Sequence, residues 1–226
     1  MKGIVVTGNN EIKREIVPSG THIARCYSMI HIGTVEWEYN GETKYTNKIR
    51  ITFELPHELR DFSGEDKPMV ISKEYTMSLH EKSNLRRDLE GWRGKSFSNQ
   101  ELSSFDVTDI LGSPCNVSII HKTSKSGNEF AQIGSISSMT KGSKCPKQIN
   151  ESFIFNYYDN FDEEWLETQP KWIQDQIKGT DEYKNKMNQQ KHHFESLPDV
   201  PKRVKSNHSL RGDMADHLTD PDSNPF

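Results

Sequence analysis

The sequence has few apolar residues and no long run of them. Apolar types make up 32% of its 226 residues, against a usual share of roughly 45%. No stretch approaches the roughly 18 consecutive apolar residues of a membrane span. The first 17 residues also lack the apolar stretch and small-residue cleavage site of a signal peptide. We therefore expect an intracellular protein with no membrane partner, whose packed core covers only part of the chain.

Cysteine and catalytic motifs are also scarce. Cys26, Cys115 and Cys145 are an odd number without CxxC spacing, which favours a reducing compartment and argues against a structural zinc site. The chain has no glycine-rich phosphate loop, no HExxH and no GxSxG motif. The adjacent His192-His193 pair would point about 100° apart on a helix. We expect no enzymatic activity, no cofactor and no metal.

Charge and polarity divide the chain into four parts. Residues 1–142 carry 18 Lys+Arg and 18 Asp+Glu, whereas residues 143–226 carry 11 and 15. A polar segment rich in proline cannot bury enough apolar surface to offset the entropy of ordering. The predicted parts are an N-terminal extension (1–17), a folded domain (18–142), a partly helical acidic aromatic segment (143–180) and a disordered tail (181–226).

The folded domain reads as a series of strands. Residues 48–55 (KIRITFEL) alternate apolar and charged side chains, which is typical of a half-buried antiparallel strand. Asn40-Gly41, between Trp37-Glu38-Tyr39 and residues 43–45, predicts a hairpin turn. Further strands are expected at residues 22–32, 69–79, 117–121 and 130–136, with a Ser-Lys-Ser-Gly-Asn turn between the last two.

One helix interrupts the strands. Leu85, Leu89 and Trp92 follow helical spacing within residues 81–92. About five strands, with a helix between the third and fourth, match the element order of the OB-fold. SH3-like barrels and other small α+β domains have similar elements, but the helix position favours the OB-fold. The predicted fold is mainly β: a five-stranded OB-fold-like barrel with one short helix, followed by a partly helical, largely disordered acidic tail.

The domain combines cations and aromatic rings, the two ingredients of a single-strand nucleic-acid site. The net charge of zero over residues 1–142 argues against strong duplex binding, where a basic face is expected, but permits a local cationic groove. The residues expected to neutralise phosphates are Lys48, Arg50, Lys73, Arg86, Arg93 and Lys122. Those expected to stack on bases are Trp37, Tyr39, Tyr45 and Tyr75. Five apolar residues are expected in the core instead: Tyr27, Phe53, Leu85, Leu89 and Trp92.

The last residues form an acidic segment that ends in Pro-Phe. Residues 213–226 contain four Asp and no Lys or Arg. An aromatic ring beside a free carboxylate suits capture by a hydrophobic pocket with basic residues around it. We expect Asp220, Asp222, Pro225 and Phe226 to bind a partner protein.

This ending resembles the acidic tip of bacterial single-stranded DNA-binding proteins, with Ser223-Asn224 departing from the pattern. Residues 18–142 resemble phage-encoded OB-fold proteins of replication and recombination, in the motif Ser-Lys-x-Tyr-Thr followed by Leu-Arg-x-x-Leu-x-x-Trp-Arg-Gly. The resemblance implies binding and protection of single-stranded DNA in the host cytoplasm. It also implies that the tip recruits replication or recombination enzymes.

The sequence also permits other interpretations. Residues 153–177 are aromatic and acidic, and we expect them to pack on the barrel, because so many exposed rings would be costly. They could instead mediate self-association into a homo-oligomer, or imitate a nucleic-acid strand. The alternative function is an acidic, DNA-mimicking interaction module that regulates a DNA-binding enzyme. A divalent-cation nuclease using Asp159, Asp162 and Glu163 is a third hypothesis.

Overall fold

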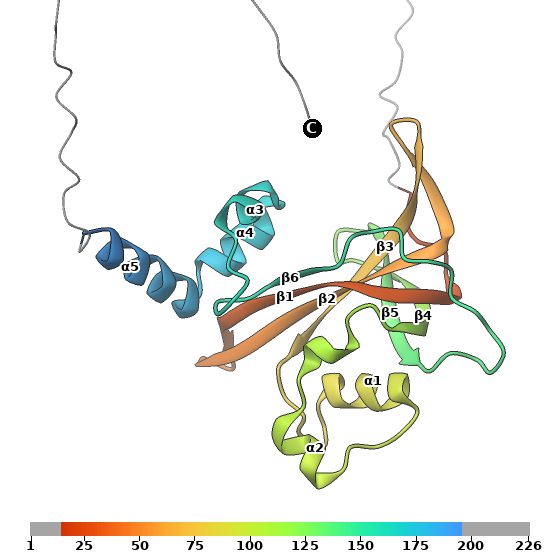
Figure 1. The fold of residues 1–226 in the computed structure, drawn as a ribbon, viewed down its shortest axis with the longest axis horizontal. Helices are drawn as coiled ribbons and strands as arrows, with labels where there is room; N and C mark the ends of the chain where they lie inside the picture. The colour runs from red at the N-terminus through yellow and green to blue at the C-terminus, as the bar shows by residue number, and fades with distance from the viewer. Residues whose placement is uncertain (1–14, 196–226) are drawn as a thin grey trace, which may run out of the picture.

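A computed structural model of the chain describes residues 15–195. It is mainly β, with a curled antiparallel sheet at its centre (Figure 1). The strands are β1 (Gly20–Tyr39), β2 (Glu42–Phe62), β3 (Glu65–Thr76), β4 (Pro114–Thr123), β5 (Glu129–Ser137) and β6 (Phe153–Phe155). The helices are α1 (Asn84–Arg93), α2 (Asn99–Ser104), the 3₁₀ turn η1 (Val107–Ile110), α3 (Glu163–Thr168), α4 (Lys171–Lys178) and α5 (Asp181–Glu195).

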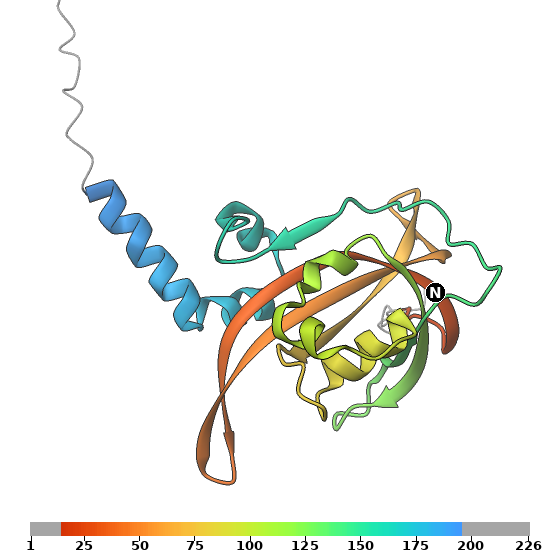
Figure 2. The same ribbon diagram turned by 60° about the horizontal axis from the view of Figure 1, so that its bottom comes forward.

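The sheet has the strand order β3-β2-β1-β4-β5, and β6 pairs with β1 in parallel. The edge strands β3 and β5 also contact each other, so the five antiparallel strands curl into a half-barrel. Helix α1, which lies between β3 and β4 in the chain, packs on the inside of the curl (Figure 2). The predicted order of five strands with a helix between the third and fourth is confirmed, but α2 and η1 follow α1 in the same connection, where a single helix was expected.

The first two strands form a long hairpin. Asn40 and Gly41 both have positive φ, 53° and 76°, which is the backbone of a type I′ turn, so the predicted turn is confirmed. β1 is longer than the predicted 22–32 strand, because Gly33 does not end it. Gly33 has φ +98° and lies at a register shift. The shift is a β-bulge that accommodates the positive φ within the strand, so β1 continues to Tyr39.

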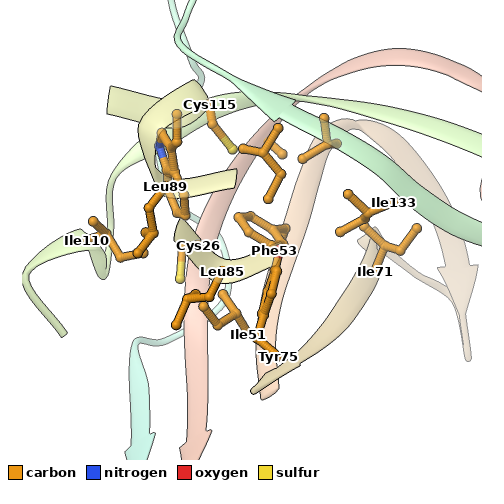
Figure 3. Close-up of a cluster of buried hydrophobic side chains, with 14 of the residues drawn as sticks. Cys26, Ile51, Phe53, Ile71, Tyr75, Leu85, Leu89, Ile110, Cys115 and Ile133 are labelled. Atoms are coloured by element: carbon orange, nitrogen blue, oxygen red, sulfur yellow. The ribbon is translucent and has the colours of Figure 1, made fainter. Parts of the chain in front are cut away.

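The inner face of the sheet carries the main core. Alternate residues of β2 point inward, as the 48–55 pattern predicts, and Ile49, Ile51, Phe53 and Leu55 are all buried. Figure 3 shows Phe53 surrounded by side chains from the other strands and from α1. The opposite, outward-facing residues of β2 therefore form the outer face of the sheet, which is the face with charged side chains.

Helix α1 closes the curl and is held by a cap and a close contact. Ser83 caps its N-terminus by accepting a hydrogen bond from the Arg86 amide, so the helix begins three residues later than predicted. Leu85, Leu89 and Trp92 are buried as expected. Gly91 lies against β5, where a Cβ atom would be 2.5 Å from the Ile136 carbonyl oxygen.

The acidic aromatic segment packs back on the outer face of β1, as predicted. A second core, separate from the main one, joins Ile30 and Ile32 of β1 to Phe155, Leu166 and Ile177. Pro170 precedes α4 as its N-cap, and α3 and α4 make the segment partly helical, as predicted. Segments far apart in the sequence thus bury one shared apolar surface.

Two charged residues of the sheet hold the connecting chain. Glu54 is fully buried, and its carboxylate accepts hydrogen bonds from the Ile149 and Asn150 amides and the Asn150 side chain. Arg25, which pairs with Glu54 in the register, donates to the Gly112 and Pro146 carbonyls at 2.7 and 2.8 Å. Residues 146–150 therefore cross the outer face at a fixed position.

The tail prediction needs one correction. Residues 181–195, expected as the start of a disordered tail, form helix α5. Its first turn is fixed because Glu182 accepts hydrogen bonds from the Thr34 amide and hydroxyl, at 2.9 and 2.6 Å. Residues 196–226, including the predicted partner-binding Asp220, Asp222, Pro225 and Phe226, lie outside the described residues. Among the described helices, none is long and apolar enough to cross a membrane.

Candidate nucleic-acid interface

The outer face of the β1–β2 hairpin gathers four of the predicted site residues. Trp37 pairs with Lys44 across the hairpin, and Tyr39 pairs with Glu42, so each pair shares a face. Lys48 and Arg50 lie on the same face as Lys44, because every second residue of a regular strand points to one side. Trp37, Tyr39, Lys48 and Arg50 therefore share one surface.

Two aromatic rings occupy the tip of this surface. Trp37 and Tyr39 are 44% and 52% exposed, and their ring centroids are 5.9 Å apart at an interplanar angle of 54°. Thr46 fixes the indole by accepting a hydrogen bond from Trp37 Nε1 at 2.8 Å. Lys44 Nζ lies 4.7 Å from the Tyr39 centroid. Glu42 Oε2 lies 3.8 Å from Lys44 Nζ, so the tip offers accessible ring surface beside an exposed ion pair.

Further along β2, two cations lie beside one carboxylate. Arg50 donates to Glu74 of β3 at 3.2 Å, and Lys48 Nζ lies 4.0 Å from the other Glu74 oxygen. All three side chains are partly exposed. Because one negative charge faces two positive ones, this part of the surface keeps a local net positive charge. Glu74 also competes with any phosphate for the same cations.

Helix α4 adds a ring that the sequence pattern did not assign to the site. Trp172 is half-exposed, and its ring lies 4.8 Å from the Arg50 guanidinium carbon. Gln176, one turn further along α4, donates to Glu74 at 3.4 Å. Trp172 belongs to the acidic aromatic segment, so only the packing of that segment on the sheet brings it beside Arg50.

The length of the outer surface indicates how many nucleotides of a single strand could lie along it. Lys44, opposite Trp37, and Arg50 are six positions apart on β2, or about 20 Å at about 3.3 Å per residue. A stacked strand rises about 3.4 Å per nucleotide, so about six nucleotides span this distance. Rings at both ends and cations between them fit one strand.

Tyr45 lies on the opposite face of the hairpin from Trp37. It pairs with Glu36, and both residues alternate with the Trp37–Lys44 pair. The sequence could have predicted this placement, because a two-residue turn at Asn40-Gly41 fixes which residues of the two strands pair and share a face. Tyr45 is therefore not part of the outer surface.

Tyr75 and Lys73 are turned inward rather than outward. Tyr75 is buried, and its hydroxyl donates to Asp88 of α1 at 3.0 Å. Burial, with the Asp88 charge as a further cause, raises the pKa of Tyr75. Lys73 Nζ donates to the same carboxylate at 2.6 Å. A buried ring cannot accept a base and a lysine paired with a buried carboxylate is already neutralised, so we leave both out of the interface.

The remaining predicted cations also lie elsewhere. Arg86 pairs with Glu90 at 3.0 Å within α1, and Arg93 pairs with Glu101 while stacking 4.3 Å from the Phe97 centroid. Lys122 pairs with Phe130 near the β4–β5 turn. Within β1, β4 pairs with the first residues alone, from Gly20 to Arg25. Lys122 therefore lies at the end of the sheet away from the hairpin tip.

The described residues contain no cluster of three His, Cys, Asp or Glu side chains arranged to hold a metal ion. Asp159, Asp162 and Glu163 therefore do not meet as a metal centre in this part of the chain. Comparison with protein-family models gives no match, and comparison with curated proteins finds no significant relative. The geometry of the site thus has to carry the functional argument.

Proposed function

We propose that the half-barrel is an OB-fold. Three features support this assignment: the strand order β3-β2-β1-β4-β5, the contact between β3 and β5, and a helix between β3 and β4 that plugs the curl. An OB-fold is a five-stranded, partly open Greek-key barrel that binds oligonucleotides with one face of its strands and adjacent loops. The β1–β2 hairpin is one of those loops.

The proposed function is the binding and protection of single-stranded DNA, in phage replication or recombination. The observation that carries it is the row of rings and cations on the outer face, from Trp37 and Tyr39 through Lys44 and Lys48 to Arg50 and Trp172. Stacking does not depend on base identity, since every base has a flat face. This surface therefore suits a sequence-tolerant binder, and the motif resemblance agrees with that role.

In the proposed mechanism, the cations neutralise phosphates and the rings hold bases, with no chemical step. Each neutralised phosphate contributes about −0.7 to the slope of log affinity against log salt for a single strand. Lys44, Lys48 and Arg50 set an upper limit of three phosphate contacts, or a slope of about −2, and competition from Glu42 and Glu74 makes the wild-type slope shallower. The C-terminal residues Pro225 and Phe226 would hold partner enzymes near the DNA strand without contacting the outer face of the hairpin.

A titration of labelled oligo-dT with the full chain tests the proposal. Trp37→Ala should weaken binding roughly 5- to 150-fold, since a stacked base contributes about 1–3 kcal/mol. Phe62→Ala is the matched control, because Phe62 is similarly exposed but lies at the β2–β3 turn, at the other end of the sheet. Equal affinities for Trp37→Ala and wild type would overturn the proposed surface.

The same titration separates the other hypotheses. No binding at low salt, together with inhibition of a DNA-binding enzyme, would support the DNA-mimic module instead. Shortening of the oligonucleotide only after magnesium or manganese is added would support the nuclease.

A further inference from the structure

A cavity of about 500 Å³ opens on the other face of the hairpin. Its walls come from β1 and β2, from the η1 turn and from the loop that follows β6. Sites for small ligands commonly fall between about 300 and 1,000 Å³. The cavity lies across the hairpin from Trp37 and Tyr39, since its wall residues Asn47 and Ile49 alternate with Lys48. It is therefore separate from the outer surface.

An exposed aromatic ring stands at the cavity. Tyr158 is 76% exposed, and its ring lies nearly parallel to His31, with centroids 6.5 Å apart and an interplanar angle of 21°. Asn47 Oδ1 lies 2.8 Å from His31 Nε2, and Tyr157 contacts the imidazole edge-on at 5.3 Å. The His31 ring is thus fixed, and Tyr158 offers a free face beside it.

The loop that carries Tyr158 is ordered by one side chain. Asn156 Oδ1 accepts hydrogen bonds from the backbone amides of Tyr158, Asp159 and Asn160, at 2.9, 3.0 and 3.2 Å. Such an Asx-type turn fixes the backbone locally. The loop therefore presents Tyr158 and Asp159 in a set geometry, which reduces the entropy cost of binding a ligand.

The chemistry of the walls selects the kind of ligand. Two carboxylates, Asp106 and Asp159, line the cavity, and its lining contains no Lys or Arg. The Thr108 hydroxyl and amide donate to Asp106 and lower the pKa of that carboxyl. Met29, Ile49 and Met77 supply apolar surface. These walls disfavour a phosphate and favour a flat ring that donates hydrogen bonds.

The hairpin geometry allows one strand to reach both faces. β3 ends at Thr76, which pairs with Lys48, and the Met77 amide still donates to the Asn47 carbonyl at 2.8 Å. Beyond Asn47 the hairpin continues as a two-stranded ribbon, and no other described strand pairs with the free edge of β2 there. Figure 2 shows this ribbon projecting past the rest of the sheet. Tyr45 lies on the cavity face, two residues before Asn47, or about 7 Å along the strand.

We propose that this cavity binds one nucleobase of the bound strand, a base with an exocyclic amino group, stacked on Tyr158 with its amino group donating to Asp159. The inference rests on the proposed function, since it needs a strand on the hairpin. The strand leaves the outer face, passes over the free edge of β2 beside Tyr45, and places this base in the cavity. Among pyrimidines, cytosine has the N4 amino donor and uracil has an O4 acceptor instead.

Oligo-dC and oligo-dU of equal length test this assignment, because their bases differ at that edge and not by a methyl group. Fluorescence anisotropy with the full chain should give about 5- to 10-fold tighter binding of oligo-dC. Tyr158→Ala should weaken oligo-dC binding and remove most of the preference, whereas Tyr158→Phe should keep both. Asp159→Asn should reduce the preference, because the asparagine Nδ2 can donate to uracil O4, whereas the Asp159 carboxylate can only accept.

The outcomes separate this inference from the function on which it rests. Wild-type protein that binds neither oligonucleotide would overturn the proposed function itself. Equal binding of both oligonucleotides, with Tyr158→Ala indistinguishable from wild type, would overturn the base cavity and leave the outer surface intact. Loss of the preference in Tyr158→Phe would also contradict the inference, because the aromatic ring is retained. Tyr158 is exposed, so a melting curve should show all variants folded.

Discussion

Removing the Glu74 charge should strengthen DNA binding, which is the reverse of the usual effect of a mutation in a binding site. Glu74 faces Arg50 at 3.2 Å and Lys48 at 4.0 Å, and its carboxylate must give up these contacts when a phosphate binds. Glu74→Gln keeps the side-chain shape and removes the competing charge. Both cations then become available to the DNA backbone.

The size of the effect follows from charge counting. Two unit charges about 4 Å apart in water interact by about 1 kcal/mol, so we expect roughly fivefold tighter binding at low salt. The local net charge rises by one, which allows about one more phosphate contact. The slope of log affinity against log salt should then become steeper by about 0.7.

Anisotropy of labelled oligo-dT across a series of salt concentrations measures both quantities. Glu65→Gln is the matched control, because Glu65 has the same charge and pairs with Lys67 at the β2–β3 turn, far from the hairpin tip. If Glu74→Gln and Glu65→Gln give the same affinity and slope, Lys48 and Arg50 do not contact DNA and the outer surface is refuted.

Three further predictions test the remaining parts of the chain. Phe155→Ala should lower the free energy of unfolding by about 3–5 kcal/mol in urea titrations, since Phe155 is fully buried in the second core; an unchanged midpoint would contradict its packing on β1. In the native protein Cys145 should react with an alkylating reagent well before the other two cysteines, because it is partly exposed whereas Cys26 and Cys115 are fully buried. Burial raises the pKa of all three thiols, that of Cys26 to about 12; mass spectrometry of labelled peptides reports the order of reaction. Deleting Pro225-Phe226 should leave DNA affinity equal or slightly higher and abolish partner recruitment in a pull-down, and a loss of affinity would contradict that division of roles.

The strands were predictable where one face is buried and the register is regular. Residues 48–55 alternate in polarity because every second residue, beginning with Ile49 and ending with Leu55, faces the core and the residues between these face outward. The 22–32 segment was harder to interpret, because register shifts after Cys26 and His31 break the alternation. The predicted strand ends at residue 32, before Gly33, yet the positive φ of Gly33 belongs to a bulge within the longer strand β1.

The candidate site was predictable only in part, for a different reason. Trp37 and Tyr39 were identified from local signals, namely the turn and the rings beside it. The burial of Tyr75 could not be predicted from local signals. It depends on Asp88 of helix α1, which accepts the hydrogen bond of the phenol hydroxyl. Trp172 depends on the docking of an entire segment onto β1, and no local pattern contains that information.

The packing of the acidic aromatic segment changes what counts as the functional unit. Composition places a boundary near residue 142, but Ile30 and Ile32 of β1 are buried only because residues 153–177 cover them. The buried Glu54 carboxylate takes all of its hydrogen bonds from Ile149 and Asn150 among the described residues. A half-barrel ending at residue 142 would therefore expose apolar side chains and leave this charge without donors, which is costly in a protein interior. The surface that carries Arg50 and the helix that carries Trp172 thus fold together, and the proposed binding surface belongs to both.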